Sequence, residues 1–188
     1  MPVKDKKITL LSLQASDGPT ARGIGKDSNV IRNLDTAQWD SVKYGLMHDI
    51  IKASFEQNKE ARELLLSTKD AKLTHLKASI RDVWRTKFPE ILTQVRSELK
   101  AEQKEEKKDK KPTSSPEAKE LTVVDISKDE DFKSLSNTAT RNVIVNGNEF
   151  PTVMHAYNYA IVGAAYVDSD TKAKYQQSIL SATSMREI

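Results

Sequence analysis

The side chains best suited to chemistry lie close together in one stretch of the last third of the chain, around His155. A histidine titrates near pH 6.5 and can act as an acid or a base in a pocket. Tyr157 and Tyr159 follow it at short spacing. Two interpretations are open: these rings line a pocket, or they belong to the hydrophobic core and the first turn of a helix. The spacing alone favours the second interpretation.

The residues before His155 predict the elements that position it. Residues 143–145 are β-branched and favour a strand, and Asn146-Gly147 is the dipeptide that best tolerates the positive φ angles of a type I′ turn. Residues 148–150 can return as the second strand of a hairpin. Thr152 is then a candidate N-cap for the helix that carries His155.

A second candidate for chemistry is the loop at residues 21–26, Ala-Arg-Gly-Ile-Gly-Lys. Its backbone N–H groups and Lys26 could hold a phosphate, but its spacing differs from that of a P-loop. Turn statistics favour an ordinary loop instead. His48 and His75 are each predicted to stand alone on a helix, and no two histidines have the spacing of metal ligands. No metal and no cofactor are therefore predicted.

A strand is predicted at residues 8–13 and a long helix from about Asp35, with Asp35 and Gln38 as a capping pair. The apolar residues of this helix recur at helical spacing and should face the core. They are Trp39, Val42, Leu46, Met47, Ile50, Ile51, Ala53 and Phe55.

Three further helical segments are predicted after this helix. Asn58 caps the first, which breaks at residues 68–70. The second is indicated by the spacing of Leu73, Leu76, Ile80 and Trp84. The third begins at Pro89, because the residue before a proline avoids the α region and proline suits the first helical position. Its apolar stripe is Ile91, Leu92, Val95 and Leu99.

The helical part runs into a segment rich in Lys, Glu and Pro at residues 104–119. It could tether nucleic acid or serve as a solvated linker, and its interleaved acidic residues favour the linker. Beyond it, residues 121–127 predict a strand and residues 127–131 an acidic loop or short helix. Ser169 or Asp170 should cap a last helix.

Composition bounds the class of protein. The chain has 188 residues, a formal charge of +3 and 37% apolar residues, which suits one soluble domain. The absence of cysteine excludes disulfides and zinc–thiolate sites. No stretch is apolar enough for a membrane span or a secretory signal, so no membrane contact is expected. The expected location is the cytoplasm, or a virion if the protein is viral. The small excess of positive charge does not indicate a nucleic-acid groove.

The second half of the chain resembles the beginning of the NADAR family, also called YbiA-like. The family pattern is F-x-x-L-S-N, a strand, a turn with glycine, a second strand and [ST]-x-E-H-A-Y. The matching residues here are Phe132, Leu135, Ser136, Asn137, Gly147, Phe150, Thr152, His155, Ala156 and Tyr157. Met154 stands where the family has the glutamate before the histidine.

The first half resembles the later part of the same family, most closely over residues 39–73. The two halves thus occur in reversed order. The resemblance implies a circularly permuted NADAR domain, or halves exchanged between neighbouring chains. The expected organisation is an N-terminal strand and loop at 1–20, a helical part at 21–103, the linker at 104–119 and a strand–hairpin–helix part at 120–188. The expected fold class is α+β, mainly helical with a small sheet.

The resemblance implies cleavage of N-glycosidic bonds in ribose-containing or ADP-ribose-like compounds. Such a reaction needs a carboxylate, and methionine cannot replace it. Glu149 and Asp82 are the candidates for a relocated carboxylate, and His155 is a candidate acid or base. An ADP-ribose-like ligand would be held by Lys26, Asn137, His155 and Trp84.

Three functions follow from these observations. The first is a non-catalytic structural or interaction protein, with protein partners or self-association, such as a component of a virion. The second is a module that binds ADP-ribose or a nucleotide. The third is an N-glycosidase that uses a relocated carboxylate. The loss of the motif glutamate at Met154 favours the first.

Overall fold

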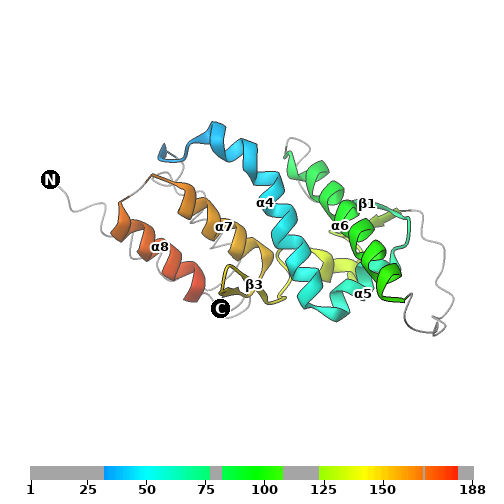
Figure 1. Ribbon diagram of the computed structural model, residues 1–188. Helices are drawn as coiled ribbons and strands as arrows, with labels where there is room; N and C mark the ends of the chain where they lie inside the picture. The colour runs from blue at the N-terminus through cyan, green and yellow to red at the C-terminus, as the bar shows by residue number, and fades with distance from the viewer. Residues whose placement is uncertain (1–31, 77–81, 108–122, 167, 182–188) are drawn as a thin grey trace. The chain divides into compact units, whose positions relative to one another are not determined.

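The computed structural model describes residues 32–76, 82–107, 123–166 and 168–181, which are mainly helical with two small sheets (Figure 1). The α+β class predicted from the sequence is therefore confirmed. The helices are α4 (Thr36–Gln57), α5 (Lys59–Ser67), α6 (Trp84–Lys107), the 3₁₀ helix η1 (Glu130–Leu135), α7 (Val153–Ala164) and α8 (Ser169–Ser181). The strands are β1 (Lys72–Thr74), β2 (Val123–Asp125), β3 (Val143–Val145) and β4 (Asn148–Phe150).

The chain divides into two compact units. The middle unit comprises residues 51–139, and the end unit comprises the described residues up to Ile50 together with those from Thr140 onwards. Helix α4 therefore contributes its first part to the end unit and its last turns to the middle unit.

The core of the middle unit forms where α6 packs against α5 and β1. The apolar stripe predicted for α6 is confirmed, because Ile91, Leu92, Val95 and Leu99 are all buried. Phe88 is also buried and extends this stripe by about one helical turn toward the N-terminus. At the opposite end of α6, Lys52 of α4 pairs with Glu98 (3.2 Å) and Glu102 (3.1 Å). These two carboxylates raise the pKa of Lys52.

Strand β1 is the main departure from the sequence prediction in the middle unit. The spacing of Leu73 and Leu76 predicts a helix, which is wrong here because residues 72–74 form a strand. Lys72, Leu73 and Thr74 pair in parallel with Val123, Val124 and Asp125 of β2. His75 accordingly follows a strand and does not lie on a helix. The residues that pair with β1 lie about fifty positions further along the chain, as Val124 does from Thr74, and the spacing of neighbouring residues cannot indicate such a partner.

The predicted helix boundary at Pro89 is also wrong. Helix α6 begins at Trp84 and continues through Pro89. A proline inside a helix removes one N–H, which would have donated to the carbonyl of Arg85 four residues earlier. The burial of Phe88 and Ile91 on the same face offsets that loss.

The hairpin and helix of the end unit follow the sequence prediction. β3 and β4 pair in antiparallel fashion, and Asn146 (φ 50°) and Gly147 (φ 79°) both have the positive φ of a type I′ turn. Thr152 is the N-cap of α7, since its side chain accepts a hydrogen bond from the His155 N–H. Helices α7 and α8 lie side by side (Figure 1).

Two helix starts were predicted with different success. The Asp35 carboxylate accepts a hydrogen bond from the Gln38 N–H (3.0 Å) at the start of α4, as predicted. Helix α8 is capped by Asp168, whose carboxylate accepts from the Thr171 N–H (2.8 Å), and not by the residues predicted from sequence. Residues 168–170 are three consecutive side chains that can each act as an N-cap, so the backbone conformation decides which of them caps the helix.

The apolar stripe of α4 is also partly corrected. Met47, Ile50, Ile51 and Phe55 are buried, whereas Val42 is 49% exposed. Asn58 is the N-cap residue of α5 as predicted, but its side chain donates backwards to the carbonyl of Ser54 (2.8 Å).

The predicted strand at 8–13, the loop that contains Lys26 and most of the linker at 104–119 lie outside the described residues. Within the described part of the chain, no helix is both long and apolar enough to cross a membrane.

Candidate functional site

The structure distributes the predicted site residues over both units. His155 and Glu149 belong to the end unit, whereas Asp82, Trp84 and Asn137 belong to the middle unit. Lys26 lies outside the described residues.

His155 is completely buried in the first turn of α7. Its ring Nδ1 lies 2.8 Å from the Oγ1 of Thr152, and its backbone N–H donates to the same oxygen (3.3 Å). Met154, in the position of the motif glutamate, is half-buried, and its carbonyl accepts from the Asn158 side chain (2.7 Å). The imidazole is thus part of the capping contact that starts α7.

The two tyrosines of this stretch contact other aromatic rings. Tyr157 is buried and lies against Trp39 with ring centroids 5.5 Å apart, and Tyr159 packs edge-on against Phe150 at 5.2 Å. Burial raises the pKa of Tyr157 well above its ordinary value, so its hydroxyl is neutral at physiological pH. These contacts are those of a hydrophobic core.

Both candidate carboxylates make local contacts. Glu149 is exposed on β4 and accepts from the Asn142 side chain (2.8 Å) across the hairpin. Asp82 accepts from the backbone N–H of Trp84 (3.0 Å) at the start of α6, so the structure brings these two predicted residues together. Each contact fixes a turn or a helix end, as short polar side chains commonly do.

Two buried arginines were not singled out from the sequence. Arg141 precedes the hairpin, and burial lowers its pKa to about 10, which leaves it charged at neutral pH. Arg96 on α6 is 5% exposed and donates to the Thr68 hydroxyl (2.7 Å) and to the Ala71 carbonyl (2.9 Å). Burial also lowers the pKa of Arg96. The sequence placed Arg96 on a helix and Arg141 just before the hairpin, but it did not indicate that either side chain is buried.

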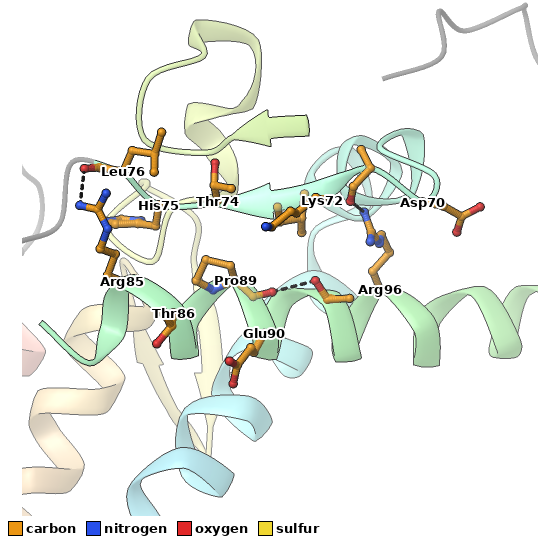
Figure 2. A pocket seen from close by; sticks show the side chains of 13 residues that line it. Asp70, Lys72, Thr74, His75, Leu76, Arg85, Thr86, Pro89, Glu90 and Arg96 are labelled. Atoms are coloured by element: carbon orange, nitrogen blue, oxygen red, sulfur yellow. Dashed lines mark hydrogen bonds between the residues drawn. The ribbon is translucent and has the colours of Figure 1, made fainter. Parts of the chain in front are cut away.

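The described residues of the middle unit form a groove of about 600 Å³. One side is formed by consecutive residues 70–76, and the other by the face of α6 that carries Arg85, Pro89 and Arg96 (Figure 2). We call this feature the β1–α6 groove. Its volume is within the range of natural ligand sites.

His75 gives the groove a titratable group. Its ring lies edge-on to Phe88 at 5.7 Å, and its Nδ1 is a buried atom that has no hydrogen-bond partner among the described residues. Burial lowers the pKa of His75 even though the charges of Asp125 and Asp82 act to raise it. His75 is therefore mainly neutral at pH 7. The sequence prediction missed this groove because it placed His75 on a helix.

Among the described residues, no cluster of three or more His, Asp or Glu side chains could hold a metal ion. No protein-family model, curated protein or solved structure matches the chain. The β1–α6 groove is lined by the cations Lys72, Arg85 and Arg96, whereas His155 and Tyr157 of the end unit take part in a helix cap and in a hydrophobic core.

Proposed function

We propose that the protein is a non-catalytic interaction protein built on a NADAR-like domain in permuted order. The observation that carries the proposal is the use made of the groups that a glycosidase would need. Met154 occupies the position of the motif glutamate, and the carboxylates of Glu149 and Asp82 are held in local contacts. Glu149 and Asp82 were the two candidates from the sequence for a carboxylate that replaces the glutamate of the motif.

The permuted order is supported by the pairing of β1 with β2. These strands come from opposite sides of residues 104–119, yet they form one parallel ladder in the middle unit. The fold would then persist without the chemistry, as happens when a site is lost and its scaffold is kept.

The test is to incubate the purified full-length protein with NAD and with ADP-ribose and to measure released base by chromatography. A known NAD glycohydrolase in the same buffer serves as the positive control. We expect no released base from the wild type. Release that Glu149→Gln or Asp82→Asn abolishes would overturn the proposal and identify the relocated carboxylate.

A binding module for ADP-ribose is the second candidate, favoured by the cations Lys72, Arg85 and Arg96 that line the β1–α6 groove. A thermal-shift titration with the same compounds separates the two. A ligand at about 100 times its Kd stabilises the folded state by about 2.7 kcal/mol, which the melting temperature reports. A rise in melting temperature without released base would favour the ADP-ribose-binding module over the interaction protein.

A further inference from the structure

The edge of β1 that faces the β1–α6 groove is unpaired within the described part of the chain. β1 pairs only with β2, on its other side. The carbonyl of Thr74 accepts from the Ile126 N–H (3.0 Å), so the backbone of Thr74 faces β2. Backbone groups alternate between the two edges along a strand, and therefore those of Leu73 and His75 face the groove.

The composition of the groove wall leads to the same conclusion. A strand that turns one face to a groove contributes every second residue, because successive side chains point to opposite faces. Here residues 70–76 all line the groove without a gap. Within this run, Lys72, Leu73 and Thr74 belong to β1, and all three border the groove, as residues along a strand edge do.

Two arginines of α6 donate to backbone carbonyls on either side of β1 (Figure 2). Arg96 donates to the carbonyl of Ala71 (2.9 Å), and Arg85 donates to the carbonyl of Leu76 (2.9 Å). Between these two contacts, Lys72 is exposed and Leu73 is 5% exposed, and the buried Nδ1 of His75 has no hydrogen-bond partner among the described residues. A strand edge that no other strand pairs with is a template for another extended chain.

The charges of the groove select the chemistry of that chain. Its two carboxylates are already engaged, since Asp70 pairs with Lys100 (2.8 Å) and Glu90 with Lys87 (2.7 Å). Lys72 is exposed and has no acidic partner among the described residues. The buried guanidinium of Arg96 donates hydrogen bonds to two neutral oxygens, those of Thr68 and Ala71. The groove is therefore complementary to acidic side chains.

The lining also distinguishes a peptide from a nucleotide. Binding of bases without sequence specificity relies on stacking against aromatic rings. The lining contains no Phe, Tyr or Trp. An exposed strand edge, in contrast, offers backbone donors and acceptors that match an extended peptide.

We infer that the β1–α6 groove binds an acidic, extended segment of a partner protein, which adds to the free edge of β1 as a third strand. Its backbone bonds to Leu73 and His75, and a carboxylate of the segment pairs with Lys72. This inference rests on the proposed function and names the surface and the partner chemistry for it.

The probe is a phage-displayed library of random octapeptides, selected on the immobilised full-length protein. We expect enrichment of Asp and Glu at alternate positions. The winning peptide is then synthesised with a fluorescent label, and its Kd is measured by anisotropy. Failure to select any peptide, or selection of peptides without acidic residues, would overturn the inference.

The matched variants are Lys72→Glu in the groove and Lys59→Glu on α5, an exposed lysine of the same unit outside the groove lining. We expect Lys72→Glu to weaken binding at least fivefold and Lys59→Glu to change it less than twofold. Equal effects of the two variants would mean that the groove is not the site.

Strand addition is tested by a version of the winning peptide that is N-methylated at alternate backbone nitrogens. This peptide keeps every charge but loses the N–H groups that pair with β1, and we expect at least tenfold weaker binding. Unchanged binding would overturn strand addition, and displacement by ADP would assign the groove to a small anion instead. Released base in the NAD assay would overturn the proposed function itself, independently of these peptide results.

Discussion

Thr152 holds the first turn of α7 through one buried hydroxyl. The oxygen accepts from the His155 N–H (3.3 Å) and lies 2.8 Å from His155 Nδ1. We expect Thr152→Ala to lower the free energy of unfolding by about 1 to 2 kcal/mol, because a cap and a buried side-chain hydrogen bond are both lost. Urea unfolding followed by circular dichroism measures the change.

The control is Thr152→Ser, which keeps the hydroxyl and removes only a methyl group. It should retain most of the capping contribution, since serine is as good an N-cap as threonine. Equal losses in Thr152→Ala and Thr152→Ser would assign the stability to the packing of the methyl group and not to the hydroxyl.

Asp125 makes the stability of the middle unit depend on acid pH. Burial acts to raise the pKa of this carboxyl, but hydrogen bonds from Ser127 and from the Leu76 N–H outweigh it, and the pKa lies below its ordinary value. A depressed folded-state pKa contributes stability above the unfolded-state value, and this stability is lost as the pH falls through the folded-state value.

We therefore expect the free energy of unfolding of the wild type to decline below about pH 4, where an unfolded aspartate begins to bind its proton. Asp125→Asn should be less stable at neutral pH and should show a shallower decline in acid. Urea midpoints at a series of pH values measure this. Parallel curves for the two proteins would show that other carboxylates dominate.

At the residue scale, the sequence revealed roles that depend on neighbours along the chain. Thr152 and Asn146-Gly147 were assigned correctly, because caps and tight turns involve contacts three or four positions apart. The burial of Arg96 was not foreseeable. Its partners, Thr68 and Ala71, lie 28 and 25 positions away.

At the scale of elements, two glycines should respond in opposite ways to the same substitution. Gly147 has a φ of +79°, and an added Cβ would meet nothing within 4 Å, so Gly147→Ala costs backbone strain alone. We expect a loss of about 1 kcal/mol. Gly45 lies inside α4, where an added Cβ also meets nothing within 4 Å.

Gly45→Ala is therefore the matched control and should raise the free energy of unfolding by about 0.5 to 1 kcal/mol, since alanine favours a helix more than glycine does. Thermal and urea unfolding of both variants measure the difference in sign. A gain in stability from Gly147→Ala would mean that the hairpin turn tolerates a different conformation.

The sequence predicted well what one helix face or one turn determines, as in the apolar stripe of α6 and the β3–β4 hairpin, but not the start of α6. β1 was mistaken for a helix because three residues are too few for alternation to outweigh the spacing of Leu73 and Leu76. The β1–α6 groove could not be predicted, since it exists only once β1 is a strand beside α6.

At the scale of the whole molecule, both units are assembled from segments on opposite sides of residues 108–122. In the middle unit, β1 pairs with β2 across this interval. In the end unit, Leu34 bridges Ala165, and the Asn33 carbonyl accepts from the Tyr166 N–H (2.6 Å). The sequence indicated this organisation only through the resemblance of its two halves to a family in which they occur in the opposite order.

This organisation predicts that the two halves of the chain stay together after the chain is cut. Replacing residues 112–118 by the recognition site of a specific protease allows a single cleavage of the purified protein. The fragments should co-elute in size-exclusion chromatography and separate only in denaturant, because each unit needs strands or helices from both fragments.

The same chromatography, run on the protein before and after cleavage, also reports the oligomeric state of the uncut protein. Cleavage of a monomer whose halves pair internally leaves a one-to-one complex of the same mass, whereas chains that exchange halves should already run as a dimer or a larger species before cleavage. Fragments that separate without denaturant would contradict both the pairing of β1 with β2 and the permuted order.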